Sequence, residues 1–145
     1  DKMKKFISFF VIIITIISSN VLIAQINEQS AKSVADKFFA ACERSDYRTA
    51  AGMLGYHGSD ESRLYKDTYN FSIHEDTDDV KRFCNRVKAT IEISDSYEFG
   101  RFSSRIVHGK EVKSLDVTFK SGNQKIKNKL IFIIVNESPV IFKLE

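Results

Sequence analysis

The sequence predicts an α+β domain in which helices precede an antiparallel sheet. Between residues 28 and 91, apolar residues recur at helical spacing, whereas after Asp95 they fall into four strand-like runs separated by short polar turns. Runs joined by such short turns pair as antiparallel neighbours, and the preceding helices can cover one face of the resulting sheet. We therefore expect three N-terminal helices packed on a curved antiparallel sheet of about four strands.

The first two helices are expected on either side of a short break. The first runs from Glu28 to Arg44. Its apolar residues share one helical face: Ala31, Val34, Ala35, Phe38, Phe39 and Cys42. Ser45 and Asp46 then offer an N-cap for a second helix, which starts at Tyr47 and reaches about Leu54.

A polar stretch, YHGSDESRLYKDTYNF, follows at residues 56–71 and separates the second helix from the third. Its Gly58-Ser59-Asp60 sequence can start a turn or cap a short helix that reaches about Tyr69. Thr77 is expected to cap the third helix, with carboxylates in its first turn, where they interact favourably with the helix dipole. The inner face of this helix would carry Val80, Phe83, Cys84, Val87 and Ile91.

Four strands are expected at residues 97–107, 111–120, 125–135 and 140–145. Leu115, Val117 and Phe119 alternate, which predicts one buried face. The run from Leu130 to Val135 is continuously apolar and predicts a central strand that is covered on both faces. Gly100 and the out-of-phase Val112 predict bulges that curl the sheet.

Residues 1–24 have the pattern of a secretory signal peptide. Lysines precede an apolar run from Phe6 to Ile17, and Ala24 is the expected cleavage point. The run is shorter than the roughly 20 apolar residues needed to cross a bilayer. We expect residues 25–145 to form a single domain that is exported to a bacterial periplasm or secreted, without membrane attachment after cleavage.

The charge of the chain does not favour a nucleic-acid partner. Removal of residues 1–24 takes away three Lys and one Asp, so the formal net charge falls from +3 to +1. Nucleic-acid binding usually requires a basic patch or stripe. Six lysines do cluster late in the chain: Lys110, Lys113, Lys120, Lys125, Lys127 and Lys129. Their spacing fits outward strand faces and turns, where Lys discourages edge pairing, better than a polyanion site.

The order of elements resembles the NTF2-like superfamily, also called cystatin-like. AKSVADKFFAACERSDYRTAAGML (31–54) looks like the opening helix, break and second helix of that family, and NESP followed by PVIFKLE looks like its final hairpin. SRLYKDTYNF and VKRFCNRVKATIE resemble small exported bacterial proteins of the superfamily that have no assigned activity. The resemblance implies a cone-shaped sheet around a pocket. It also implies dimerisation through the open face of the sheet in many members, and in some an Asp or His base with a Tyr donor.

Cys42 and Cys84 allow two interpretations. In an exported protein they could form a disulfide, which would contribute about 4 kcal/mol in the chain-entropy model. Because each lies on the apolar side of a predicted helix, they could equally be two buried free thiols.

No catalytic, metal or cofactor site is predicted. The histidines and cysteines lack the short spacings of a zinc site, and HEDTDD at residues 74–79 lacks the EF-hand pattern, so we interpret that run as a helix cap. Gly-x-Ser-x-Gly and Gly-rich phosphate-binding loops are absent from the sequence. The positions that would look into a cone are mostly apolar: Phe38, Phe39, Val87, Leu115, Val117 and Phe119.

We therefore expect a non-enzymatic binding domain that holds a small apolar ligand in the cone or a protein partner. Tyrosine suits partly wet contacts, and the candidate ligand-binding residues are Tyr47, His57, Arg63, Tyr65 and Tyr69. The spacing of Tyr65 and Tyr69 also fits simple packing of a short helix. The alternatives are a small-pocket acid–base enzyme that uses His57, Asp60 or Tyr65, and a homodimer formed through the sheet.

Overall fold

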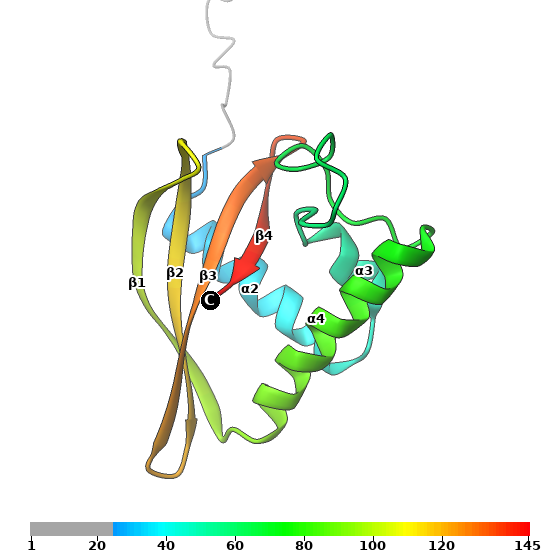
Figure 1. Cartoon of the computed structure of the whole chain (residues 1–145). Helices are drawn as coiled ribbons and strands as arrows, with labels where there is room; N and C mark the ends of the chain where they lie inside the picture. Colours follow the sequence, from blue (N-terminus) through cyan, green and yellow to red (C-terminus); the bar gives the residue numbers. More distant parts are fainter. Residues whose placement is uncertain (1–24) are drawn as a thin grey trace, which may run out of the picture.

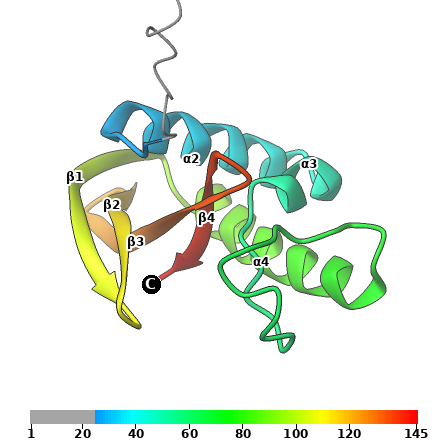
Figure 2. The ribbon, with the colours of Figure 1, turned by 90° about the horizontal axis from the view of Figure 1, so that it is seen from above.

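The computed structural model describes residues 25–145, and the predicted signal peptide at residues 1–24 lies outside them. Three helices come first in this part of the chain: α2 (Glu28–Glu43), α3 (Tyr47–Gly52) and α4 (His74–Glu92). The strands follow: β1 (Ser96–Val107), β2 (Lys110–Ser121), β3 (Gln124–Val135) and β4 (Ser138–Leu144). The helices lie on one side of the curved sheet (Figures 1 and 2). The predicted α+β order, with helices before an antiparallel sheet, is confirmed.

Side chains fix the starts of the first two helices. The Asn27 side chain accepts a hydrogen bond from the Ser30 backbone N–H at 2.8 Å, and Ser30 Oγ accepts one from the Asn27 N–H at 3.1 Å, which forms a capping box. Asp46 caps α3 by accepting from the Thr49 N–H at 3.2 Å. Asp46 therefore has the capping role expected from the sequence.

The cap expected at Thr77 is wrong, because α4 begins three residues earlier, at His74. Thr77 lies in the first turn, where its hydroxyl donates to the carbonyls of Phe71 and Ile73 at 2.8 and 3.0 Å. A hydroxyl in a helix can make this bond to a carbonyl four residues back. No side chain caps α4 at Ile73.

Of the two alternatives expected from Gly58-Ser59-Asp60, a turn or a short helix, the turn forms, and the chain follows a series of turns between residues 58 and 69. The residues on either side of these turns make backbone hydrogen bonds to β4 and to each other. The Gly55 N–H donates to the Ile141 carbonyl of β4 at 2.8 Å, and the Tyr69 N–H donates to the Leu54 carbonyl at 3.1 Å. The polar stretch is thus held beside the edge of β4 by backbone hydrogen bonds, which a propensity argument does not predict.

The sheet is a meander in the order β1-β2-β3-β4, and every neighbouring pair is antiparallel. The strand bounds agree with those expected to within two residues. Two of the two-residue turns have both residues at positive φ: His108 and Gly109 at 49° and 73°, and Asn136 and Glu137 at 48° and 62°. Such turns match the twist of antiparallel strands, which explains the compact hairpins.

Two register shifts bend the sheet. One lies between Phe99 and Phe102 of β1, as expected from Gly100, and the other lies between Ile131 and Phe132 of β3. The bulge expected at Val112 is wrong, because Val112 pairs in regular register with Arg105. Its apolar character has another cause: Val112 is buried on the outer face of the sheet.

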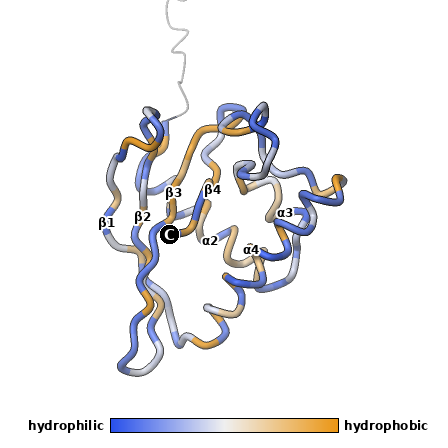
Figure 3. The backbone as a smooth tube through the Cα atoms, viewed as in Figure 1, coloured by the Kyte–Doolittle hydropathy of each residue, from blue (hydrophilic) through white to orange (hydrophobic). Residues whose placement is uncertain are grey.

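Both faces of the sheet carry a core. Nineteen buried residues form the inner cluster between the helices and the sheet, with Phe38, Phe39, Leu115, Leu130 and Phe132 among them. A smaller outer cluster covers the opposite face of β3 and β4: Val112, Ile131, Ile133, Val135, Val140 and Phe142. The expectation that the third strand is covered on both faces is therefore confirmed, and the upper half of β3 is strongly hydrophobic (Figure 3).

Candidate functional site

The polar stretch 56–71 covers the outer cluster. The Tyr65 ring stacks on Phe142 with centroids 4.7 Å apart, and His57 meets the same ring edge-on, also at 4.7 Å. A Cβ on Gly55 would lie 3.1 Å from Ile133 Cδ1, so a larger residue at this position would require Ile133 to shift by a few tenths of an ångström. Burial lowers the pKa of His57, and the charges of Lys143 and His108 act in the same direction.

Arg63 fixes the conformation of this polar stretch through its hydrogen bonds. It donates four hydrogen bonds: two to the carboxylate oxygens of Asp76 at 3.0 and 2.8 Å, one to the Thr68 carbonyl at 3.1 Å and one to Asp67 at 3.3 Å. Its guanidinium also lies 3.8 Å from the centroid of the Tyr56 ring. Bidentate pairing and stacking are the geometry for which Arg is suited, so Arg63 has a structural role here.

Asp76 is the buried partner in this network, with a relative exposure of 3%. Burial alone would raise its pKa, but hydrogen bonds from Arg63 and the Asn70 N–H, together with the Arg63 charge, outweigh burial and hold the pKa below its ordinary value. HEDTDD therefore contributes an anchoring carboxylate to the fold in addition to favourable charge at the start of α4.

The five candidate ligand-binding residues do not converge on one site. His57 and Tyr65 meet on Phe142, whereas Arg63 and Tyr69 line a polar groove of about 520 Å³ beside α3. Tyr47 stacks on Phe71, which also lines this polar groove, and the Tyr47 hydroxyl donates to Asn85 Oδ1 of α4 at 3.0 Å. These contacts join residues that are distant in sequence, so a linear pattern does not reveal them.

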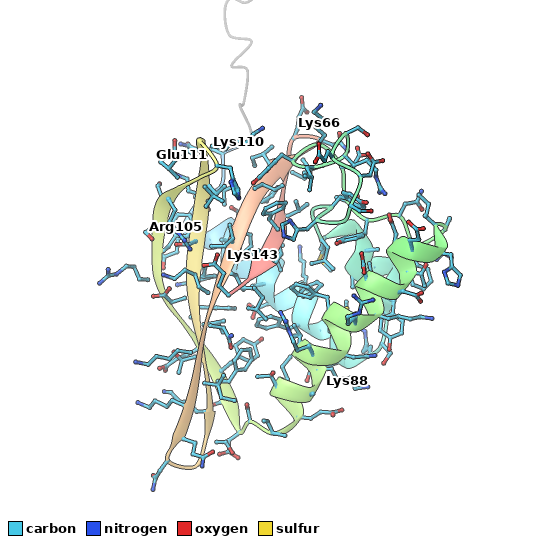
Figure 4. All side chains as sticks on the ribbon, in the orientation of Figure 1. Lys66, Lys88, Arg105, Lys110, Glu111 and Lys143 are labelled. Carbon is cyan, nitrogen blue, oxygen red and sulfur yellow. The ribbon has the colours of Figure 1, made fainter. Side chains whose placement is uncertain are left out.

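An upper groove opens where β2 and β3 separate. Their pairing ends at Lys113 and Phe132, so the ends of the two strands beyond this point pair only with β1 and β4. The gap encloses about 390 Å³, and Tyr65 and Ile26 lie at its sides. Lys110 and Glu111 mark the β2 side (Figure 4). The Lys110 ammonium lies 4.7 Å from the centroid of the Tyr65 ring, so this candidate residue already has a cationic partner.

A lower groove of about 290 Å³ lies between α4 and the opposite end of the sheet. Its floor is formed by Val87 and Phe119, which are 1% and 2% exposed. Ile126 of β3 lies at the opening and is 41% exposed. The remaining lining residues are Arg86, Thr90, Asn128, Leu144 and Glu145. An apolar floor that is open to solvent at one side can accept a side chain from another molecule.

The lower groove adjoins an unpaired strand edge. β3 has twelve residues and β4 has seven, and the last backbone bonds between the two chain segments join Lys129 and Glu145 at 2.8 and 2.9 Å. Residues 124–128 of β3 pair with β2 on one side, and within residues 25–145 nothing pairs with them on the other. We call these five residues the free edge.

The two cysteines lie in contact inside the inner cluster. Cys42 of α2 and Cys84 of α4 are free thiols in this structure, with their sulfur atoms 2.7 Å apart, and both residues are fully buried. The hydrogen bond with Cys84 raises the pKa of Cys42, and burial adds to the increase. A buried thiol of this kind is a poor nucleophile in the folded protein.

The described part of the chain contains no grouping of three or more His, Cys, Asp or Glu side chains that could hold a metal ion. Its helices include none that combines the length and hydrophobicity needed to span a membrane. Among these residues every buried side-chain nitrogen or oxygen atom has a hydrogen-bond partner. The inner cluster therefore contains no unpaired polar group that faces a cavity.

Comparison with protein-family models and with curated proteins gave no match. A solved structure titled "Rd1NTF2_04 with long sheet" is similar to this chain with a TM-score of 0.43 and 13% sequence identity. The match covers 79% of this chain and 97% of that one. Similarity at this level assigns neither a family nor a function, so the conclusions below depend on the geometry of the chain itself.

Proposed function

We propose that this chain is an exported domain with an NTF2-like arrangement that binds a protein partner at the lower groove. One observation carries the proposal: an unpaired strand edge lies directly beside an open groove with an apolar floor. Exposed strand edges are templates for pairing with another chain. The partly exposed Ile126 connects the two features, because it belongs to the free edge and lines the groove.

The inner cluster favours a surface role over a ligand held inside a cone. Phe38, Phe39 and Phe132 occupy the space between the helices and the sheet, and each is at most 1% exposed. The buried carboxylate, Asp76, is paired with Arg63. The residues considered for acid–base chemistry have structural contacts: Tyr65 stacks on Phe142, and Asp60 accepts from Ser62 at 2.6 Å.

Export is supported by the signal-peptide pattern of residues 1–24. The contact between Cys42 and Cys84 adds support, since a pair of cysteines in contact suits an oxidising compartment. Fractionation of producing cells, with intact mass measurement of the protein, tests this part of the proposal. We expect the protein outside the cytoplasm with residues 1–24 removed.

Site-specific photo-crosslinking tests the binding site. A photoreactive residue placed at Ile126 should form a discrete protein adduct in the cells that naturally produce the chain. The matched control is the same residue at Ile106 on β1, which is 71% exposed and lies away from the lower groove. Equal adducts from both positions, or none from Ile126, would contradict the proposal.

A further inference from the structure

We propose that the free edge of β3 binds an extended segment of the partner in which acidic and apolar residues alternate. This inference rests on the proposed function and names the chemistry of its partner. Three features of the site define that chemistry: the direction of the backbone groups, the apolar groove on one side of the strand, and the unpaired positive charges on the other.

The backbone of the free edge offers a short ladder of hydrogen-bonding groups. The N–H and C=O of Lys129 both bond to Glu145, so the odd-numbered residues of this part of β3 direct their backbone groups away from β2. By the alternation of an antiparallel ladder, the N–H and C=O of Lys127 and Lys125 point into solvent at the free edge. The even-numbered residues, among them Ile126, bond to β2. A partner strand of five residues can therefore pair with two donors and two acceptors.

The side chains of the free edge differ between its two faces. Ile126 and Asn128 point inward and line the lower groove beside Phe119, whereas Lys127 lies on the outer face near Lys129 and Asp116. A paired strand has its own side chains on the same two faces, in register with those of β3. The partner residues opposite Ile126 and Asn128 would enter the groove, where the buried floor favours valine-sized or leucine-sized side chains.

The charges on the outer face of the free edge determine which residues the partner strand should have on its matching face. Lys125 and Lys127 are exposed, and neither forms an ion pair within residues 25–145. The nearby acid, Glu145, is already neutralised by Arg105 at 2.7 Å and Lys143 at 3.1 Å. Acidic residues opposite the two lysines complement this surface.

The same charges argue against a second copy of this chain as the occupant. Two free edges paired with each other would place Lys125 and Lys127 of one copy opposite lysines of the other. Like charges directly opposite on a strand pair are destabilising. The lysines that protect the edge from self-pairing thus select for an acidic partner strand.

The test is titration of the folded domain with a capped pentapeptide that alternates valine and glutamate, with glutamate at positions two and four. We expect saturable binding, with slower amide hydrogen exchange at Lys125 and Lys127 and little change at Ile126, whose N–H is already paired. The double variant Lys125→Glu/Lys127→Glu should weaken binding about tenfold or more, because two ion pairs become repulsions. Higher salt should weaken binding of the natural domain by screening the same charges.

The matched control is Lys37→Glu/Lys66→Glu, which makes the same change in net charge at two exposed lysines. Lys37 lies on α2, and Lys66 lies in the polar stretch at the other end of the molecule (Figure 4). The control should bind the peptide about as well as the natural domain. A pentapeptide with lysine in place of glutamate should not bind.

Several results would overturn the inference: equal affinity for the acidic and basic peptides, unchanged affinity of the double variant, or exchange protection that falls on the upper groove. Self-association that slows exchange at Lys125 and Lys127 without peptide would point to a second copy and would also overturn it. If the peptide fails while a photoreactive residue at Ile126 still captures one protein, the proposed function stands and only the partner chemistry is wrong.

Discussion

The contact between Cys42 and Cys84 leads to a quantitative prediction about stability. The two residues are 42 positions apart in the sequence, and their sulfur atoms lie 2.7 Å from each other, so a small shift of the side chains would bring them to the length of about 2.0 Å for a disulfide bond. We predict that oxidation during folding joins α2 to α4 covalently. A closed loop of this length stabilises a folded chain by about 4 kcal/mol in the chain-entropy model.

The expected shift in melting temperature follows from the size of the domain. For about 120 residues, an unfolding entropy near 2.1 cal/mol/K per residue converts 4 kcal/mol into a shift of about 15 °C. The assay is thermal unfolding, followed by circular dichroism, of protein refolded with a glutathione redox buffer and measured with and without a phosphine reductant. The reduced sample should melt about 15 °C lower.

The control for this experiment is the Cys84→Ala variant, which cannot form the bond and should melt at the same temperature with and without reductant. Because both thiols are buried and the pKa of Cys42 is raised, the folded, reduced protein should also oxidise slowly compared with the refolding chain. A shift below about 3 °C, or two titratable thiols after oxidative refolding, would refute the prediction in favour of two buried free cysteines.

Three further changes test other parts of the fold. Asp76→Asn should cost about 3 kcal/mol in denaturant unfolding, because it removes the buried carboxylate that pairs with Arg63 and leaves the more exposed Asp67 as the remaining charged partner of the guanidinium. Since the pKa of Asp76 is lowered in the folded state, its contribution is complete above pH 4 and is lost as the pH falls further, so the variant should lose less stability below pH 4 than the natural protein. Glu137→Gly should raise the free energy of unfolding by about 0.5 kcal/mol, because Glu137 has a φ of 62° in its turn; an unchanged denaturation midpoint would contradict this. Gly55→Ala should lower stability by about 1 kcal/mol, because its methyl group would lie 3.1 Å from Ile133 Cδ1, and a stabilised variant would show that the outer cluster can adapt.

The fold was predictable because its elements follow strong local patterns. The strands agree with expectation to within two residues, since alternation and two-residue turns limit where each hairpin can begin and end. The start of α4 was placed too late because Thr77 is a common capping residue. The interaction that stabilises this region joins Asp76 to Arg63, thirteen positions away, and periodicity gives no information about such a contact.

The candidate site was harder to predict, because residue type does not separate functional from structural use. Tyr65, His57 and Arg63 are residues that often contact ligands, yet here Tyr65 and His57 pack on Phe142 and Arg63 bonds to Asp76. The lower groove contains fewer such residues, but the sequence of the strand beside it has a distinctive pattern. Ile126 sits between two lysines in a strand that extends beyond its neighbour.

The position of the polar stretch explains why the two ends of the sheet differ. At the upper end, backbone hydrogen bonds of Ile141 with Gly55 and Met53 occupy the edge of β4, and the Tyr65 ring covers Phe142, so both the edge and the outer face are protected. At the lower end, β4 stops at Leu144 and no other described segment pairs with β3 beyond Lys129. An edge that is left open usually carries charge to prevent aggregation, and Lys125 and Lys127 provide it. Ile126 lies between these lysines and beside the apolar floor of the lower groove, so a strand paired to the free edge would bury Ile126 together with Val87 and Phe119.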